Sequence, residues 1–403
     1  MGSKYAFLSY LIPEQMEQEV FHNSKNNMQA AANALEWHIY NGLCRNLNCE
    51  IKIINFLPIS NFPQYYKKPY IKTSSFKTDS CNENINLGFC NLVLIRRTSQ
   101  FYRLVHELEK WLKVDAEEKT LFIYTASDIF LKAVEKLKTK YEFKTCVIIA
   151  DLPNMAVLNS GLSNIKKLYV NRIASKTDKY LKNIDCFVLL TEHMATYLGI
   201  SQPYCVMEGI ATTNSLIQNI PSKNEKTVLY SGLLHKKFGI LNLLEAFHSI
   251  KDDTYRLVLC GQGDAEQEIL EMCKKDTRIS FMGQLPRNEV LQLQQQATLL
   301  VNPRQNNEEF TRYSFPSKNL EYLSAGRPLV AYKLDGIPDE YDEYIFYVED
   351  DSIQTLSNKI VEICSMDNNV LFEHCRKTQQ FVFENKNELA QTKKIIELIG
   401  YID

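Results

Sequence analysis

The chain has 403 residues, of which 45% are hydrophobic and 23% are charged, as in folded globular proteins. It is too long for one ordinary hydrophobic core, so we expect two domains of roughly 200 residues each. The formal net charge of −2 argues against an overall electrostatic grip on nucleic acid.

No segment of the sequence predicts secretion or a membrane span. The eleven cysteines are scattered singly, without a CxxC pair or metal-ligand spacing, so we interpret them as buried thiols in a reducing compartment. No signal peptide is visible at Met1, and no apolar run approaches the roughly 20 residues that span a bilayer. We therefore expect a cytoplasmic protein, or one attached peripherally at the inner membrane face.

The N-terminal half alternates between strand and helix patterns. Its segment Ile12–Lys25 is polar and predicts a loop, and loops at strand ends often hold ligand contacts in α/β proteins. Strands that alternate with helices imply right-handed βαβ units and a parallel, doubly wound sheet. The predicted strands are Lys4–Leu11, Ile51–Leu57, Leu92–Ile95, Leu121–Tyr124, Cys146–Ala150 and Cys186–Thr191. The predicted helices are Asn26–Cys44, Arg103–Leu112 and Ile129–Lys138.

The pattern restarts after a polar segment at Ile217–Glu225 that suits a linker. We therefore predict two Rossmann-like domains, at residues 1–220 and 226–380, with a ligand cleft between them. A C-terminal helix at 381–403 is expected to pack back on the N-terminal domain. The predicted strands of this half are Val228–Ser231, Tyr255–Cys260, Ile279–Met282, Leu299–Asn302 and Leu329–Tyr332. Its predicted helices are Gly239–Ile250, Ala265–Lys274, 354–368 and 369–398.

The stretch Ser314–Ala331 carries the clearest local signals. Pro316 suits the first turn of a helix, Ser314 is a plausible cap just upstream, and Gly326 is the left-handed residue that ends the helix. The helix is therefore expected to begin and end within this stretch.

Lys318 and Glu321 lie three residues apart, so they share one face near the start of this helix. Helix N-termini bind anions through free N–H groups and a partial positive charge. Lys318 adds a full charge for a phosphate, and Glu321 can accept hydrogen bonds from a sugar diol. The alternative is an ordinary Lys–Glu pair on a surface helix, which is equally common.

Two glycine-containing turns follow predicted strands. The first, Gly261–Gly263, lacks the third glycine of a dinucleotide-binding turn because Glu266 holds that place, so a plain tight turn is favoured over NAD binding. The second, Tyr230–Gly239, contains Lys236 and Lys237, whose charges could face a diphosphate. A solvated basic turn explains these lysines equally well.

Six motifs follow one another through the C-terminal half: Gly232…Gly239, Gly261–Gly263, Phe281–Gly283, Asn302–Arg304, Phe315–Glu321 and Asp335–Pro338. In this order they resemble the donor domain of retaining glycosyltransferases of the GT-B fold, in particular family 4. The resemblance is strong across residues 226–345 and fainter over the N-terminal half. There, Val188–Met194 and Val206–Gly209 resemble the family's strand and loop leading into the linker.

The resemblance implies a role for each donor-side residue. Glu321 would hold the ribose hydroxyls of a nucleoside diphosphate sugar. Lys318 and the helix start around Ser314 and Ser317 would meet the diphosphate, for which Gly232 leaves room. The base would lie beside three consecutive residues, Gly283, Gln284 and Leu285.

The sequence departs from the family at several of these positions. Tyr313 stands where the family often has a glutamate that contacts the donor sugar. Leu233 and Phe238 stand where the family has an arginine and a lysine. Charge compensation of the diphosphate is then expected from Lys318, with Arg304 or Lys237 as helpers.

Other residues could replace two groups of the family that this sequence lacks. Glu308 or Glu309 could replace the missing glutamate. The family's N-terminal histidine falls near Asp151, so Asp151 is the candidate polar group at the cleft, with a turn or cap role as its alternative.

Residues 163–183 form a basic amphipathic stretch that could lie on an anionic membrane surface, although a solvated helical face is the favoured reading. None of the seven histidines has a partner at metal-ligand spacing, so no metal or other cofactor is predicted.

We therefore predict a retaining hexosyltransferase with the GT-B fold that uses Lys318, Glu321 and Asp151. The donor would be a UDP- or GDP-sugar, and the acceptor a saccharide or lipid-linked saccharide in polysaccharide or glycoconjugate biosynthesis. Two alternatives stay open: a non-catalytic nucleotide-sugar-binding partner in a glycosylation complex, and a nucleotide-sugar epimerase on the same fold.

Overall fold

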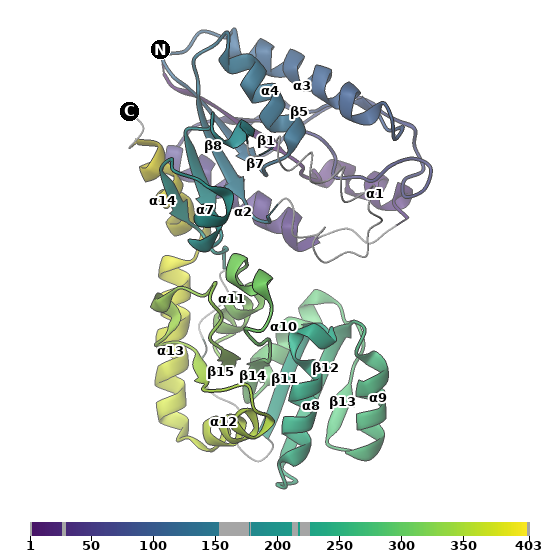
Figure 1. Cartoon of the computed structure of the whole chain (residues 1–403), viewed down its shortest axis with the longest axis vertical. Coiled ribbons are helices and arrows are strands. Elements are labelled where there is room, and N and C mark those ends of the chain that lie inside the picture. The colour runs from purple at the N-terminus through teal and green to yellow at the C-terminus, as the bar shows by residue number, and fades with distance from the viewer. Residues whose placement is uncertain are drawn as a thin grey trace. The chain divides into compact units, whose positions relative to one another are not determined.

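The computed structural model describes residues 2–25, 30–152, 177, 179–211, 217 and 226–400. The chain divides into two compact units, one formed by Met1–Met207 with Glu388–Asp403 and the other by Glu208–Asn387. In each unit, helices pack on a mainly parallel sheet (Figure 1). Most of the predicted linker and of the basic stretch 163–183 lies outside the described residues.

The first unit is built on an eight-stranded sheet in the order β10-β9-β8-β7-β1-β2-β5-β4. All neighbours pair in parallel except β4 and β5. From β1 the chain first adds β2 on one side and later β7 on the other, so the strand order reverses at β1. The strands are β1 (Lys4–Ser9), β2 (Ile51–Asn55), β4 (Ser74–Phe76), β5 (Asn84–Asn86), β7 (Lys119–Tyr124), β8 (Lys144–Ile149), β9 (Cys186–Leu189) and β10 (Tyr204–Val206), with a separate pair β3 (Tyr70–Ile71) and β6 (Phe89–Cys90).

The helices of this unit form two packed pairs, α3 with α4 and α2 with α14 (Figure 1). The second pair is close because Gly42 has no side chain: a Cβ there would lie 2.5 Å from the carbonyl oxygen of Glu388. Asn46 then donates a hydrogen bond of 2.8 Å to Thr392 across the pair. The helices are α1 (Glu14–Asn23), α2 (Ala30–Leu47), α3 (Arg96–Leu112), α4 (Asp128–Lys138), α7 (His193–Leu198) and α14 (Glu388–Gly400).

Two local predictions for this unit are wrong. The expected loop at Ile12–Lys25 contains helix α1, in which Val20 is the one buried apolar residue and Phe21 is half exposed, so the apolar pattern is too weak to predict a helix. The expected strand at Leu92–Ile95 is an exposed turn that leads into α3, with 93% of Leu94 accessible to solvent. A short apolar run does not by itself specify burial in a sheet.

The second unit has six parallel strands in the order β13-β12-β11-β14-β15-β16. In chain order this is the 3-2-1-4-5-6 arrangement of a Rossmann sheet, with its reversal between β11 and β14. The strands are β11 (Lys226–Leu233), β12 (Tyr255–Gln262), β13 (Ile279–Phe281), β14 (Leu299–Asn302), β15 (Leu329–Tyr332) and β16 (Phe346–Val348). The helices are α8 (Ile240–Ser249), α9 (Glu266–Lys275), α10 (Arg287–Gln296), α11 (Ser317–Ser324), α12 (Ile353–Ser365) and α13 (Asn368–Asn385).

The single helix predicted at 369–398 is instead two helices, α13 and α14, which belong to different units. The break falls at Lys386 and Asn387. The side-chain amide of Asn387 donates to the carbonyl oxygen of Phe383, so it satisfies an acceptor in the last turn of α13. Lys386, next to the break, is fully buried.

Lys386 forms a buried ion pair with Glu208, the first residue of the second unit. Its Nζ lies 2.5 Å from Glu208 Oε1, which also accepts a 2.5 Å hydrogen bond from the Tyr341 hydroxyl. The backbone carbonyl of Lys386 accepts a 2.8 Å hydrogen bond from Ala211. The two segments at which the chain passes between the units are therefore tied together inside the second unit.

We predict that Lys386→Met lowers the free energy of unfolding of the second unit by about 3–5 kcal/mol, because it leaves Glu208 buried without its counter-charge. Urea-dependent hydrogen exchange in α13 measures this loss. The double variant Lys386→Met/Glu208→Gln should recover most of it, because the buried charge is gone and Glu340, the other partner of Lys386, is half exposed and can be solvated. Lys393→Met, which removes an exposed pair with Glu397 at 3.7 Å, is the control and should cost less than about 1 kcal/mol. Equal losses for the two lysine variants would contradict the assignment.

Candidate functional site

Glycines lie at three adjacent strand ends on the carboxyl edge of the second sheet. Gly232 lies at the end of β11, Gly261 near the end of β12, and Gly283 shortly after β13. Ligands of doubly wound sheets bind outside the carboxyl ends of the strands, where the strand order reverses. That position is the gap between β11 and β14, beside Gly232.

The glycines allow the backbones of these strand ends to approach one another. A Cβ on Gly261, whose φ is 136°, would lie 1.7 Å from the carbonyl oxygen of Gly232. The Gly261 N–H donates a 2.8 Å hydrogen bond to the carbonyl oxygen of Gly283. A Cβ on Gly232 would lie 3.1 Å from Lys318 Cε, which places Lys318 at the switch point.

Lys318 and Glu321 form a partly buried pair at this edge. Lys318 Nζ lies 3.1 Å from Glu321 Oε1, and about a quarter of each side chain is exposed (27% and 21%). Gln294 donates hydrogen bonds to Glu321 at 2.5 Å and to Ser231 at 3.0 Å. Burial alone would raise the pKa of Glu321, but Lys318, Gln294 and Arg287 lower it below the ordinary value. Glu321 is therefore a carboxylate that is ready to accept hydrogen bonds.

Helix α11, which carries both residues, is fixed to the sheet by buried hydrogen bonds. The Tyr322 hydroxyl accepts a 2.8 Å hydrogen bond from the backbone N–H of Ser231 on β11. Asn319 Oδ1 accepts a 2.7 Å hydrogen bond from Asn302 at the end of β14. The start of α11 is thereby held against the two strands that flank the switch point.

Arg304 follows β14 and lies within a cluster of aromatic rings. Its guanidinium is 4.5 Å from the ring centre of Phe310 and 5.6 Å from that of Phe238. Lys237 Nζ lies 5.5 Å and 5.4 Å from the same two rings, so both predicted helper cations occupy one cluster. Burial lowers the pKa of Arg304 to about 10, which still leaves the group charged at neutral pH.

The prediction that Ser314 caps this helix is wrong. The helix begins at Ser317, and the N-cap position is Pro316, which makes no side-chain capping bond. Ser314 Oγ instead accepts a 2.9 Å hydrogen bond from Arg304 and donates to the carbonyl oxygen of Phe310 at 3.0 Å. Ser314 therefore orients the cation cluster.

The other predicted donor-side residues lie at or near the same edge. Ser317 is exposed in the first turn of α11. Gln284 is exposed after β13, and Leu285 packs partly against the hydrophobic core. Tyr313 ends the 3₁₀ turn Glu309–Tyr313. Gln294 and Tyr322, which hold Glu321 and α11 in place, were not identified from the sequence because neither belongs to a recognisable motif.

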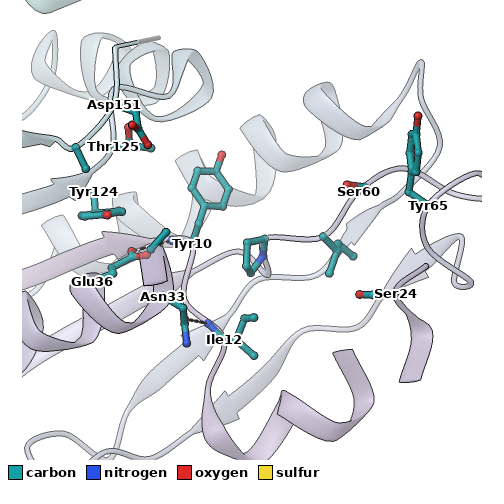
Figure 2. Close-up of a pocket in the computed structure, with 14 residues that line it drawn as sticks. Tyr10, Ile12, Ser24, Asn33, Glu36, Ser60, Tyr65, Tyr124, Thr125 and Asp151 are labelled. Carbon is teal, nitrogen blue, oxygen red and sulfur yellow. Dashed lines mark hydrogen bonds between the residues drawn. The ribbon is translucent and has the colours of Figure 1, made fainter. Parts of the chain in front are cut away.

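The first unit contains a cavity of about 370 Å³ at the carboxyl ends of its own central strands (Figure 2). Tyr10 follows β1, Tyr124 ends β7 and Asp151 follows β8, so the cavity lies at the switch point of this sheet. The described residues that line it are Tyr10, Ile12, Ser24, Ala32, Asn33, Glu36, Pro58, Ile59, Ser60, Tyr65, Tyr124, Thr125, Ala150 and Asp151. Asp151, predicted from the sequence, therefore lies in this cavity with many residues that were not predicted.

Glu36 is the most deeply buried ionisable carboxyl in the lining, with 2% of its surface exposed. Glu36 Oε1 accepts a 3.0 Å hydrogen bond from the backbone N–H of Tyr10, and Asn33 holds the N–H of Ile12 in the same way at 2.8 Å (Figure 2). Burial raises the pKa of Glu36 well above its ordinary value, against the smaller opposing effect of the Tyr10 hydrogen bond. Its only signal in the sequence is an acidic residue inside an otherwise mainly apolar helical stretch.

The described residues contain no group of three or more His, Cys, Asp or Glu side chains arranged to hold a metal ion. Within the same part of the chain, no helix is long and apolar enough to cross a membrane.

Residues 225–366 match the family model described as "Glycosyl transferases group 1". No curated protein sequence matches the chain. The solved structures that are similar include sucrose-phosphate synthase from Thermosynechococcus elongatus, 16% identical, with a TM-score of 0.64 over 99% of both chains. Anabaena Alr3699/HepE in complex with UDP is 13% identical, with a TM-score of 0.61 over the whole of both chains. The α,α-trehalose-phosphate synthase (UDP-forming) of Burkholderia xenovorans in complex with glucose-6-phosphate is 11% identical, with a TM-score of 0.62 over 98% of this chain and 100% of that chain.

With two Rossmann-like units and these neighbours, the chain has the GT-B fold of glycosyltransferases, as the sequence predicted. The part of the chain that matches the glycosyl transferases group 1 family model, residues 225–366, includes the glycine edge, Arg304, Lys318 and Glu321.

We predict that replacing the buried Glu36 with glutamine changes how stability depends on pH. The unfolded chain ionises Glu36 near its ordinary pKa of 4.5, whereas the folded chain keeps it protonated to a higher pH. Folding then takes up a proton, so wild-type stability falls as pH rises from 4.5 towards the raised pKa, by up to about 1.4 kcal/mol per pH unit.

Glu36→Gln retains an acceptor for Tyr10 but cannot ionise. Its melting temperature should therefore rise relative to wild type between pH 5 and pH 8, as followed by differential scanning fluorimetry. The exposed Glu17→Gln serves as control. A difference between Glu36→Gln and wild type that stays constant across this range would show that Glu36 ionises normally.

Proposed function

We propose that the chain is a glycosyltransferase that moves a sugar from a nucleoside diphosphate sugar to a hydroxyl group of a saccharide acceptor, with retention of configuration. The observation that carries the proposal is the position of Lys318 and Glu321 beside Gly232, at the switch point of the second sheet. The similar Anabaena structure is described as a complex with UDP, so UDP is the first nucleotide to test.

The donor would bind with its diphosphate over Gly232 and Lys318. The ammonium group and the free N–H groups at the start of α11 are preorganised for the negative charge that develops on the leaving group. Arg304, held by Ser314 and two aromatic rings, supplies a second cation. Glu321, kept ionised by Lys318, Gln294 and Arg287, would accept hydrogen bonds from the ribose hydroxyls.

In the reaction, the acceptor hydroxyl oxygen forms a bond to the anomeric carbon of the donor sugar. The bond between that carbon and the diphosphate oxygen breaks, and the nucleoside diphosphate leaves with the electron pair. The proton of the acceptor hydroxyl passes to a phosphate oxygen of the donor. We propose that the protein cations carry out the charge stabilisation without a metal ion, so that EDTA leaves the rate unchanged.

The acceptor would bind in the cavity of the first unit, where Asp151 and Glu36 offer polar groups to hydroxyls. Asp151 occupies the strand end at which the resembled family has a histidine, and we propose that it contacts the acceptor.

Calorimetric titration with UDP, GDP and ADP tests the donor site. We expect micromolar binding of one nucleotide and a roughly 10- to 100-fold loss of affinity for Lys318→Ala, because a charge-assisted hydrogen bond contributes about 1.5–3 kcal/mol. Glu321→Ala should also weaken binding, and to a smaller extent for a nucleotide analogue that lacks ribose hydroxyls.

The exposed Lys275→Ala and Glu271→Ala on α9 are matched controls and should bind as wild type does. If no nucleotide binds, the proposed function fails. If a nucleotide binds but its sugar conjugates are never consumed, the chain is a binding partner rather than an enzyme.

Retention of configuration predicts the stereochemistry of the product. An α-linked nucleotide sugar should give an α-linked glycoside, because the same face of the anomeric carbon is attacked and vacated. The coupling constant of the anomeric proton, measured by NMR early in the reaction, distinguishes the two anomers. A β-linked product would contradict retention while leaving the transferase function in place.

A further inference from the structure

The charged side chains that line the cavity of the first unit determine which acceptors can bind there. Among the fourteen lining residues that the structure describes, the ionisable side chains are two carboxyls, Glu36 and Asp151, and three tyrosines. None of these lining residues is lysine, arginine or histidine. Proteins bind phosphoryl groups through cationic side chains or several convergent N–H groups.

The guanidinium of Arg96 lies behind the described lining, where it donates hydrogen bonds to the carbonyl oxygen of Ile59 at 2.6 Å and to the side chains of Asn61 and Asn91. The first turn of α2 is a second positively polarised feature at the cavity. It contributes Ala32 and Asn33, and a helix start carries roughly half a positive charge. Asn33 Oδ1 is already occupied by the N–H of Ile12, and Glu36 lies in the next turn of the same helix. Among the described residues, a dianionic phosphoryl group here would face two carboxyl groups, with this partial charge and the already hydrogen-bonded Arg96 in its favour but no cation in the lining itself.

The same lining suits an uncharged polyol. Asp151, Ser60 and Thr125 present oxygen atoms that hydrogen-bond to hydroxyls. The raised pKa of Glu36 allows its carboxyl group to donate a proton in a hydrogen bond.

The cavity also has a fixed aromatic wall. The ring of Tyr10 is held by stacking on Phe130, with ring centres 4.5 Å apart, and by its hydroxyl at 3.1 Å from Ser127 Oγ. Tyrosine offers an apolar face for the C–H groups of a sugar ring together with a polar hydroxyl. The volume of about 370 Å³ lies at the lower end of the range for small-molecule sites, which suits the terminal part of an acceptor.

We propose that this cavity binds an uncharged saccharide end and rejects sugar phosphates, so that the acceptor hydroxyl belongs to a neutral sugar. The proposal rests on the proposed transferase function and narrows its acceptor class. It also separates this chain from the Burkholderia xenovorans structure, whose described ligand is glucose-6-phosphate.

To test the proposal, the protein is incubated with a panel of UDP-sugars and GDP-sugars as donors and with matched pairs of acceptors. The pairs are glucose, mannose, fructose and N-acetylglucosamine, each beside its 6-phosphate, and products are identified by mass spectrometry. We expect transfer to at least one neutral sugar at ten or more times the rate for its 6-phosphate. An equal or faster rate for a 6-phosphate overturns the proposal.

A variant that adds a cation to the cavity provides an internal check. Ser60→Arg should lower the ratio of neutral to phosphorylated product at least tenfold, whereas Ser201→Arg, an exposed serine outside the lining, should leave it unchanged. An unchanged ratio in Ser60→Arg counts against the cavity as the site of selection.

Nucleotide binding, measured on the same protein, distinguishes failure of the neutral-acceptor proposal from failure of the proposed transferase function. If a nucleotide binds but no member of any pair is glycosylated, the neutral-acceptor proposal fails and the donor site stands. If no nucleotide binds and no transfer occurs, the proposed function itself fails.

Discussion

The close approach of the backbone at the carboxyl edge of the second sheet is the constraint on which the proposed donor site depends. β11 and β12 end so close together that a single methyl group on Gly261 would overlap the carbonyl oxygen of Gly232. Because no side chain occupies this edge at Gly232, Lys318 can lie directly beside the strand end. The chemistry proposed for the site follows from this, since a diphosphate needs both backbone access and a nearby cation.

Around that edge, hydrogen bonds from neighbouring residues hold Glu321, helix α11 and Arg304 in place. Gln294 links Glu321 to β11, Tyr322 fixes α11 to the same strand, and Ser314 holds Arg304. Such fixed dipoles and charges need little reorganisation when charge develops in a reaction, which is the main advantage of a protein site over water.

Both units have polar residues at the point where the strand order of the sheet reverses, but the kinds of residue differ. In both sheets, polar residues collect where the strand order reverses, but the second unit presents cations and glycines there and the first presents carboxyls and tyrosines. The roles proposed for the two units, binding of an anionic leaving group and of a hydroxyl acceptor, would be served by this difference in charge. Lys386 and Glu208 form a buried ion pair, and both lie in the segments where the chain passes from one unit to the other.

The sequence by itself determined the doubly wound α/β class and most of the central strands, because alternating apolar runs and helical periods reflect burial directly. It also predicted that Lys318 and Glu321 share one face near the start of a helix, and the structure places them 3.1 Å apart there. Their roles, and those of Arg304 and Asp151, which came from the family resemblance, stay predictions.

Only the tertiary structure decided features that depend on contacts between distant segments. The exposed turn at Leu92–Ile95, the division of the C-terminal helix at Lys386, and the change of Ser314 from a cap to a partner of Arg304 all depend on such neighbours. The same holds for Glu36: the sequence shows an acid in a helix, whereas the structure buries it in a cavity beside Tyr10, and this burial raises its pKa. Burial and pairing are set by the whole fold, and no local pattern of residues encodes them.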